Sequence, residues 1–310
     1  MTIGSLRLGT RASTLARVQS QQVAAALAKH LDLRVETVEI ATRGDHNDEP
    51  LAQIGGTGVF VSALREALLR HEIDAAVHSL KDLPTLPAEG LWIGAVPERE
   101  DPRDVLVARG GLTLAELPTG AVVGTGSPRR AAQLRAVRAD LEVTDIRGNV
   151  DTRLRRVAEG AYDAVVLARA GLARLDRLDA VTEVFDPLQV TPAPGQGALG
   201  VECRADDAAT RSVLQPLDHP DSRAAVTAER ALLSALEAGC TAPVGALADV
   251  ADDIDGPELY LRAVVVSVDG SRAVRMSTTG DVGDADSLGR RLAESMLADG
   301  AAGLMGVGVR

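Results

Sequence analysis

Short apolar runs alternate with longer segments of helical spacing over the first two thirds of the chain. Residues 5–9 and 74–78 have the length and composition of buried strands. Residues 14–30 show helical spacing, and Ser13 or Thr14 can cap that helix. Strands that alternate with helices are typical of doubly wound α/β folds with mostly parallel sheets.

Three short strings occur twice, in the same order, at the ends of predicted strands. This repetition predicts two similar α/β lobes. Ligands of such sheets bind beyond the carboxyl ends of the strands, so two facing lobes would form a ligand cleft. The paired strings are Gly9-Thr10 with Gly124-Thr125, Thr42-Arg43-Gly44-Asp45 with Ile146-Arg147-Gly148-Asn149, and Asp74-Ala75-Ala76-Val77 with Asp163-Ala164-Val165-Val166.

The pattern changes after residue 197, where a segment rich in Pro and Gly leads into a strand at 198–203. We expect helices at 205–217 and 222–238, the second ended by Gly239 in a left-handed conformation. An antiparallel meander and a closing helix at 285–298 complete the chain. The predicted fold is α/β, with two doubly wound lobes similar to periplasmic binding proteins around a cleft, plus a smaller C-terminal domain with an antiparallel sheet. The expected domains are lobe one at 1–100 and 198–217, lobe two at 101–197, and the C-terminal domain at 218–310.

One segment of this acidic chain is basic. The formal net charge is −11, yet the eleven Arg and seven acidic residues from Ser127 to Arg177 sum to +4. Because the planar guanidinium binds two oxygens at once, this segment predicts an anion site for nucleic acid, phosphate or polycarboxylate. The acidic total and an aromatic content of 2% count against nucleic acid, and the acidic total also counts against a membrane surface. The alternative, a solvated helix face, applies to Arg135, Arg138, Arg155, Arg156 and Arg177.

The cysteines and histidines limit the kinds of site. Residues 1–13 do not resemble a signal peptide, and no uncharged apolar run nears the ~18 residues that span a bilayer, so we expect a cytoplasmic protein. Cys203 and Cys240 are widely spaced, which argues against a structural disulfide. The five His lack metal-ligand spacing, so we expect no metal. Cys203 lies in an apolar strand and is expected to be inert, which leaves Cys240, in a loop, as the candidate for chemistry.

Residues 125–130, Thr-Gly-Ser-Pro-Arg-Arg, stand at the start of a predicted helix. Free backbone N–H groups, the hydroxyls of Thr125 and Ser127 and the guanidinium groups of Arg129 and Arg130 converge there, which favours an anion site. The alternative is an ordinary Ser cap with Pro in the first turn. In lobe one the matching position holds Arg11 and Ser13, and Arg147 opens the next loop of lobe two.

Lys81 and Asp82 follow a buried strand at its carboxyl end. Asp82 can serve as a catalytic carboxylate, with Lys81 as its partner or as an anion ligand. The alternative is that Asp82 caps the turn before Pro84. Residues 195–200 match the dinucleotide fingerprint as a string, but they precede a strand instead of opening a helix, which argues against a nucleotide site.

The chain resembles the porphobilinogen deaminase family in eight strings, which run in the family's order from residue 6 to residue 245. The strings are Leu8-Gly9-Thr10-Arg11-Ala12-Ser13, Thr42-Arg43-Gly44-Asp45, His78-Ser79-Leu80-Lys81-Asp82-Leu83-Pro84, Glu98-Arg99-Glu100-Asp101-Pro102-Arg103-Asp104, Gly124-Thr125-Gly126-Ser127-Pro128-Arg129-Arg130, Ile146-Arg147-Gly148-Asn149-Val150-Asp151-Thr152-Arg153, Pro194-Gly195-Gln196-Gly197-Ala198 and Leu236-Glu237-Ala238-Gly239-Cys240.

The resemblance implies a monomeric three-domain transferase of tetrapyrrole and haem biosynthesis. The family condenses four porphobilinogen molecules head to tail into hydroxymethylbilane and releases ammonia. It implies that a dipyrromethane cofactor is bound covalently at Cys240 and that Asp82 is the catalytic carboxylate. The residues that match those holding the carboxylates of cofactor and substrate are Arg11, Ser13, Lys81, Thr125, Ser127, Arg129, Arg130, Arg147, Arg153 and Arg174.

Two positions depart from the common family pattern. Thr57 stands where many members have Lys, which puts in doubt a basic contribution from the loop at 55–60. Pro128 stands where many members have Leu, and Pro is well tolerated in a first helical turn. A different reading, a two-lobed anion-binding protein without catalysis, would require neither Asp82 nor Cys240.

Overall fold

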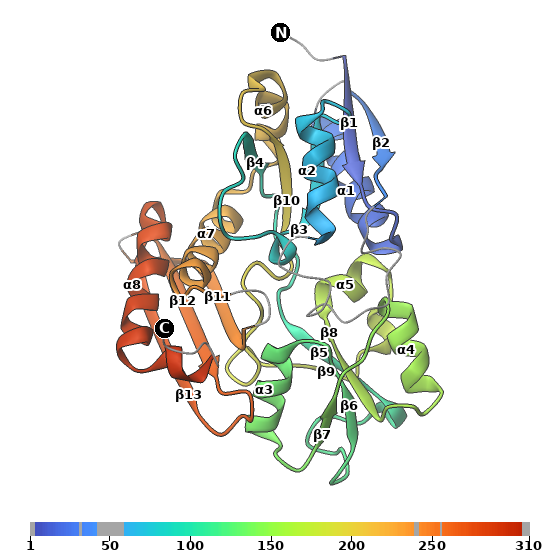
Figure 1. Cartoon of the computed structure of the whole chain (residues 1–310), viewed down its shortest axis with the longest axis vertical. Helices are drawn as coiled ribbons and strands as arrows, with labels where there is room; N and C mark the ends of the chain where they lie inside the picture. The colour runs from blue at the N-terminus through green and yellow to red at the C-terminus, as the bar shows by residue number, and fades with distance from the viewer. Residues whose placement is uncertain (1–3, 31–32, 42–58, 239–241, 255, 306–310) are drawn as a thin grey trace. The chain divides into compact units, whose positions relative to one another are not determined.

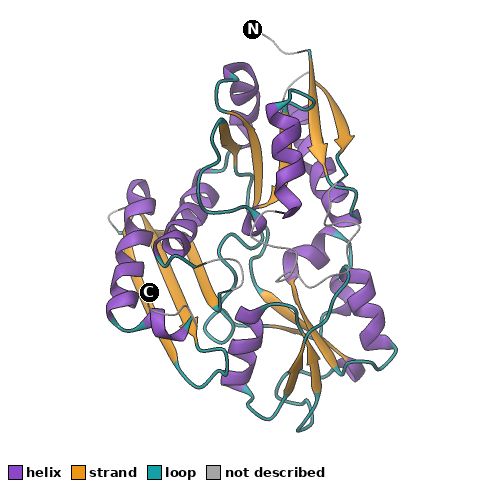
Figure 2. Cartoon of the chain, viewed as in Figure 1, coloured by secondary structure: helices purple, strands orange, loops and turns teal. Residues whose placement is uncertain are grey.

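The computed structural model describes residues 4–30, 33–41, 59–238, 242–254 and 256–305. It divides into two compact units, Met1–Glu100 with Ala198–Arg223, and Asp101–Gly197 with Ala224–Arg310. Figures 1 and 2 show the elements of both. We call the first the N-terminal unit and the second the Arg-rich unit.

The N-terminal unit is built on a five-stranded sheet of order β2-β1-β3-β10-β4. Strands β1, β2 and β3 are parallel, and β10 runs antiparallel to both β3 and β4. Its elements are β1 (Ser5–Thr10), α1 (Thr14–His30), β2 (Arg34–Glu39), α2 (Val59–Leu69), β3 (Ala75–Ser79), the 3-10 turn η2 (Leu80–Asp82), β4 (Leu91–Ala95), β10 (Leu199–Arg204), α6 (Ala208–Leu214), η5 (Gln215–Leu217) and the start of α7 (Pro220–Ala235).

Helices α1 and α2 cover opposite faces of this sheet. Ala75 and Val77 of β3 pack in one core with Leu27 of α1. Ala76, between them, packs in another core with Leu64 of α2. Successive side chains of a strand point to opposite faces, so the alternation confirms the doubly wound arrangement.

The Arg-rich unit contains a second five-stranded sheet, of order β7-β6-β8-β5-β9. Strands β6, β7 and β8 are parallel, and β5 is antiparallel to β8 and β9. Leu134 of α3 and Val157 of α4 belong to separate cores on the two sides of this sheet. The elements are β5 (Asp104–Ala108), η3 (Arg109–Gly111), β6 (Val122–Gly124), α3 (Pro128–Val137), β7 (Glu142–Thr144), α4 (Val150–Ala158), β8 (Ala164–Ala168), α5 (Arg169–Arg174), η4 (Leu178–Ala180) and β9 (Glu183–Val184).

The two sheets repeat one design, as the paired strings predict. Leu8 pairs with Ala75 in the first sheet, and Val123 pairs with Ala164 in the second. The Asp directly before β3 and the Asp directly before β8 make the same contact. Asp74 Oδ2 accepts the backbone N–H of Arg7 at 2.8 Å, and Asp163 Oδ2 accepts that of Val122 at 2.8 Å.

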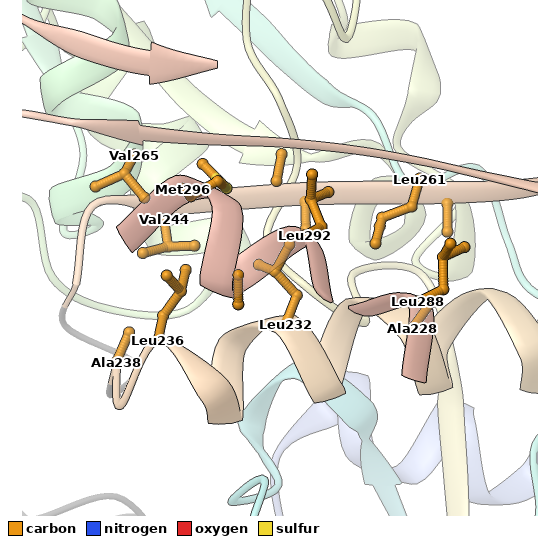
Figure 3. Packing of buried hydrophobic residues seen from close by; sticks show 14 of the residues in the cluster. Ala228, Leu232, Leu236, Ala238, Val244, Leu261, Val265, Leu288, Leu292 and Met296 are labelled. Carbon is orange, nitrogen blue, oxygen red and sulfur yellow. The ribbon is translucent and has the colours of Figure 1, made fainter. Parts of the chain in front are cut away.

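The C-terminal part of the Arg-rich unit is a three-stranded antiparallel meander with α7 and α8 packed on it. Figure 3 shows Ala228 and Leu232 of α7 beside Leu288 and Leu292 of α8, and Leu236 beside Val244 of the sheet. The prediction of a smaller C-terminal domain with an antiparallel sheet is therefore confirmed. The residue boundaries expected for the three domains stay a prediction. The elements are β11 (Val244–Asp253), β12 (Gly256–Val266), β13 (Ala273–Asp281), η6 (Val282–Asp284), α8 (Ala285–Ala298) and η7 (Ala301–Leu304).

Several expected bounds differ from the observed ones. Helix α7 ends at Ala235, and Glu237 takes the left-handed conformation, with φ 52°, that we expected of Gly239. Gly239 itself lies outside the described residues. The helix expected from 205 begins at Ala208, because the Asp207 side chain caps it by accepting the N–H of Thr210. Strand β4, the short β9 and helix α5 were missed.

Within the described ranges, no helix is both long and apolar enough to cross a membrane. The same residues contain no cluster of three or more His, Cys, Asp or Glu suited to a metal ion.

Candidate functional site

The N-terminal unit carries four of the predicted site residues at one edge of its sheet. Arg11 and Ser13 follow β1, and Lys81 and Asp82 lie in η2 directly after β3. Because β1 and β3 are parallel neighbours, their carboxyl ends meet at this edge. Ser13 also starts α1, since its Oγ accepts the N–H of Ala16 at 3.3 Å.

Asp82 is exposed at this edge, next to the half-buried Lys81. The turn is closed through the backbone, where the N–H of Leu83 donates to the carbonyl of Leu80 at 3.1 Å. In the described part of the chain, no hydrogen bond to the Asp82 carboxylate is present. Capping of the turn therefore does not account for an Asp here, and the carboxylate is left available for chemistry.

The Arg-rich unit contains the string from Thr125 to Arg130 at the start of α3. Ser127 is the N-cap of α3, and its Oγ accepts the N–H of Arg130 at 3.5 Å. The N–H of Ser127 donates to Thr125 Oγ1 at 3.2 Å. These contacts fix the turn between β6 and α3, with Pro128 in the first helical turn as expected.

Arg129 and Arg130 are buried around one carboxylate, that of Asp104. Their exposed fractions are 4% and 7%, and that of Asp104 is 0%. Arg129 Nη1 lies 2.8 Å from Asp104 Oδ2, and Arg130 donates from Nε and Nη2 to Oδ1 at 3.0 and 2.7 Å. Gln196 Nε2 donates to the same Oδ1 at 2.8 Å.

The sheet topology explains why Asp104 lies there. Strand β5 runs opposite to β8, so its first residue, Asp104, pairs with the last residue of β8, Ala168. An acid at the start of β5 therefore reaches the edge where β6 leads into Arg129 and Arg130. Burial raises the pKa of Asp104, but the charges of Arg129 and Arg130 outweigh it and hold that pKa well below its usual range.

Arg147 and Arg153 extend the positive charge along the same edge. Arg147 Nε donates to Asp145 at 2.8 Å, and Arg153 Nε donates to the carbonyl of Gly148 at 2.9 Å. Burial, followed by the charges of Arg130 and Arg147, lowers the pKa of Arg153. Neighbouring positive charges thus disfavour one another here, and a bound anion would relieve that repulsion.

The structure brings most of the predicted residues together within each unit. Arg174, in α5 after β8, donates from Nη2 to the carbonyl of Gly197 at 2.7 Å. Two predicted positions, Cys240 and Thr57, lie outside the described residues. The residues at the edge of the N-terminal unit are Arg11, Ser13, Lys81 and Asp82, and those in the Arg-rich unit are Thr125, Ser127, Arg129, Arg130, Arg147, Arg153 and Arg174.

Two of the arginines that we assigned to a solvated face are structural instead. Arg138 donates to the carbonyls of Leu114 and Leu117 at 2.6 and 3.0 Å. Arg135 donates to the carbonyl of Val268 at 3.0 Å, which connects α3 to the hairpin between β12 and β13. The interpretation as exposed residues holds for Arg155 and Arg156.

Sequence reasoning missed three buried polar side chains, Asp104, Gln196 and Glu229. Glu229 of α7 accepts the backbone N–H groups of Gly195 and Ala248 at 2.6 and 2.8 Å. A signal existed for Asp104, an acid that opens a fully apolar strand, and for Gln196, which stands within the family-like string from Pro194. Both residues belong to strings that carry the family resemblance, but their burial is not predicted from the sequence.

The donors of the Arg-rich unit fit a group with several carboxylates, such as a dipyrromethane. Arg129 Nε is buried and, among the described residues, has no hydrogen-bond partner. Four guanidinium groups, those of Arg129, Arg130, Arg147 and Arg153, lie close enough to influence one another. Among the described residues, Asp104 is buried between Arg129 and Arg130, and Asp145 pairs with Arg147. Charge-assisted bonds from Arg to carboxylate are the strong kind of hydrogen bond.

Comparison with known proteins gives matches over nearly the whole chain. The family model described as "Porphobilinogen deaminase, dipyromethane cofactor binding domain" matches residues 6–212, and "Porphobilinogen deaminase, C-terminal domain" matches residues 223–298. "Porphobilinogen deaminase 1" of Streptomyces coelicolor is 59% identical over 99% of both chains. The porphobilinogen deaminase of Thermobifida fusca is 57% identical over 97% of this chain and 96% of its own. That of Mycobacterium tuberculosis is 54% identical over 97% and 98%.

A putative methionine-binding lipoprotein from Bacillus subtilis is a distant structural match, with 12% identity and a TM-score of 0.42 over 69% of this chain and 90% of that chain. A likeness this weak carries no argument about a ligand. The two family models together cover most of the chain, and the relatives exceed half identity over nearly its full length. The chain therefore belongs to the porphobilinogen deaminase family.

Proposed function

We propose that this chain is a transferase of tetrapyrrole biosynthesis that condenses four porphobilinogen molecules into hydroxymethylbilane and releases ammonia. Membership of the family supports this proposal. The observation in the structure that carries it is the group of arginines in the Arg-rich unit, Arg129, Arg130, Arg147 and Arg153, beside which the described residues supply two paired carboxylates, Asp104 and Asp145. A cluster of like charges with few counter-charges is suited to a ligand with many carboxylates.

The arginines bind and orient the reactants. Each pyrrole unit carries an acetate and a propionate, so every addition brings further negative charge to the site. Arg129, Arg130, Arg147, Arg153 and Arg174 are the groups of the Arg-rich unit that we assign to these carboxylates, with Thr125 and Ser127 as hydroxyl donors. Arg11, Ser13 and Lys81 are the corresponding groups of the N-terminal unit. The positive charge offsets the repulsion between carboxylates and keeps the units in a reactive orientation.

Asp82 is the residue that we assign to proton transfer and charge stabilisation. Loss of ammonia from porphobilinogen leaves a positively charged methylene-pyrrolenine. An exposed carboxylate that accepts no hydrogen bond from the described residues can stabilise that cation and can move protons during the condensation. Asp82 stands in a short 3-10 turn that the hydrogen bond from the N–H of Leu83 to the carbonyl of Leu80 closes.

Cys240 is the residue that we assign to covalent attachment of the dipyrromethane. When bound, the dipyrromethane supplies the pyrrole terminus to which porphobilinogen is joined. The other thiol, Cys203, is 0% exposed in β10, and burial raises its pKa to about 11. A thiol that forms so little thiolate at neutral pH is a poor nucleophile, so Cys203 is excluded as the residue that attaches the dipyrromethane.

The same proposal includes a cytoplasmic location and a monomeric state. The two widely spaced cysteines, one of them a buried free thiol, support a reducing compartment. Binding of nucleic acid is disfavoured because the net charge is −11.

Intact-mass measurement of the purified protein tests the function. The wild type and a Cys203→Ser variant should both carry an added mass of two joined pyrrole units, whereas Cys240→Ser should have the mass of the plain polypeptide. Both variants remove one thiol, so the comparison isolates the attachment site. A folded, active wild type without added mass would refute the proposal, and an adduct that persists in Cys240→Ser would move the attachment elsewhere.

A further inference from the structure

Asp104 is a fully buried carboxylate that faces two guanidinium groups and one side-chain amide. Both of its oxygens face guanidinium groups, Oδ2 that of Arg129 and Oδ1 that of Arg130. Gln196 holds Oδ1 from a third direction and is itself fixed by donating to the carbonyl of Pro102 at 2.7 Å. The carboxylate is thereby locked in one orientation.

Backbone carbonyls also hold the two guanidinium groups. Arg129 Nη1 donates to the carbonyl of Thr191 at 2.6 Å, and Arg130 Nη1 donates to that of Val166 at 3.1 Å. Each arginine therefore contacts both Asp104 and a backbone carbonyl, that of Thr191 for Arg129 and that of Val166 in β8 for Arg130. Such bonds define the plane of a guanidinium group, and the plane decides in which direction it can bind a further carboxylate.

The charge of this group is as important as its geometry. Two buried guanidinium groups without Asp104 would repel each other at short range in a region of low polarity. Removing both charges from water is costly, and a single buried carboxylate between them compensates in part. Arg129, Arg130 and Asp104 together carry a charge of +1, so attraction for an anion is retained.

Removing the negative charge alone would raise the charge of the group to +2, yet it would also release the two side chains from their common anchor. A greater charge favours anion binding, and a loss of orientation opposes it. Orientation should prevail, because the benefit of correctly placed groups depends on ångström-scale geometry.

We propose that Asp104 is a positioning residue, which fixes Arg129 and Arg130 so that both guanidinium groups meet the carboxylates of the pyrrole chain together. This inference rests on the proposed function. It assigns to Asp104 no contact with cofactor or substrate, since Asp104 is fully buried, its Oδ1 accepts hydrogen bonds from Arg130 and Gln196, and its Oδ2 lies 2.8 Å from Arg129 Nη1.

The test measures formation of the covalent adduct, which does not require turnover. Apo protein is produced in cells that make no porphobilinogen, porphobilinogen is then added over a range of concentrations, and the added mass is followed with time. In Asp104→Asn, the half-saturating concentration of porphobilinogen should rise by about tenfold or more. Asp140→Asn is the matched control, because Asp140 pairs with Arg138 at 2.7 Å at the other end of α3. It should behave as the wild type.

A double-mutant cycle shows whether Asp104 acts through the arginines. If it does, Asp104→Asn should add clearly less than its full single-variant effect to the defect of Arg129→Gln, because one of the two groups that Asp104 positions is already gone. Effects that multiply, or a normal half-saturating concentration in Asp104→Asn, would overturn the inference.

Thermal unfolding is recorded for each variant. If Asp104→Asn does not fold, Asp104→Glu takes its place in the cycle, since it keeps the charge and shifts the carboxylate by one methylene group. It should also raise the half-saturating concentration, and a normal value would overturn the inference. A wild type that forms no adduct would refute the proposed function itself, whereas a wild type that loads beside normal Asp104 variants refutes only the role of Asp104.

Discussion

The guanidinium group of Arg65 in α2 donates three hydrogen bonds of 2.9 to 3.2 Å to the carboxylate of Glu202 in β10. His78 Nε2 of β3 lies 3.5 Å from the same carboxylate, and both Glu202 and His78 are nearly inaccessible. These three side chains connect α2 with strands β10 and β3. His78 stands four residues before Asp82. The three side chains support the turn from which the proposed catalytic carboxylate emerges.

Replacement of Glu202 by Gln should lower the free energy of unfolding by about 3 kcal/mol at pH 7, because it leaves Arg65 without its counter-charge. Burial raises the pKa of Glu202, but the contacts with His78 and Arg65 outweigh it and lower that pKa. The stabilisation is therefore present above the unfolded-state pKa of about 4.3 and is lost as the pH falls through the lower folded-state value.

Urea unfolding from pH 7 down to pH 3 checks this prediction. The difference between wild type and Glu202→Gln should shrink toward the acidic end. The control is Glu66→Gln, since Glu66 pairs with Arg70 at 3.4 Å with both side chains more than 60% exposed, and it should change stability by less than about 0.5 kcal/mol. A constant difference over the whole pH range would contradict the assignment of the stabilisation to the charge of Glu202.

Asp82→Asn should abolish nearly all turnover without weakening the fold. Asp82 is exposed and accepts no hydrogen bond from the described residues, so the free energy of unfolding should stay within about 0.5 kcal/mol of the wild type. Ammonia release from porphobilinogen should fall by about a hundredfold or more, in line with the loss of a general acid–base group. Glu89→Gln, another exposed acid of the same unit, is the control and should keep full activity. Substantial turnover in Asp82→Asn would remove Asp82 from the mechanism.

The regular elements could be read from the sequence wherever local signals define them. Helix α1 covers the expected 14–30 because Ser13 caps it, and α8 covers the expected 285–298. The repeat of short strings at Asp74 and Asp163 correctly predicted two sheets of the same design, because both Asp residues close the same backbone contact.

The missed features depend on partners that are distant in sequence. Asp104 meets Arg130, 26 residues away, only because β5 is antiparallel, and Glu202 meets Arg65 across 137 residues. Charge alone also could not show that Arg138 binds backbone carbonyls instead of solvent. The sequence therefore predicts which residue types the site needs, whereas the pairings that hold those residues require the folded sheet.

Gly270→Ala should destabilise the Arg-rich unit by about 2–3 kcal/mol. Gly270 has φ +78°, and a Cβ there would lie 2.6 Å from the backbone N of Ala136 in α3. The substitution thus combines a strained backbone with overpacking between α3 and the hairpin. Gly120→Ala is the matched control, because φ is +77° there and a Cβ would meet nothing within 4 Å. Chemical denaturation should show a loss of only about 1 kcal/mol for the control. Equal losses would mean that the hairpin contact adds nothing to stability.

Glu237→Gly should raise the free energy of unfolding. After α7, the N–H of Glu237 donates to the carbonyl of Ser234 at 3.0 Å and that of Ala238 donates to Leu233 at 3.3 Å, a helix ending that places Glu237 in the left-handed region at φ 52°. In a non-Gly residue that conformation causes a backbone strain of about 1 kcal/mol, which Gly avoids. The Gly also has more freedom in the unfolded chain, so the net gain should be about 0.5 kcal/mol.

The matched comparison is Glu294→Gly, at an exposed position inside α8, where the same replacement should instead cost about 1 kcal/mol. Thermal unfolding of the two variants beside the wild type would show the opposite signs directly. Two losses of similar size would indicate that Glu237 makes a favourable contact that outweighs its backbone strain. Because Cys240 follows three residues later, the rate of adduct formation in Glu237→Gly would then report whether this helix ending also affects the proposed attachment site.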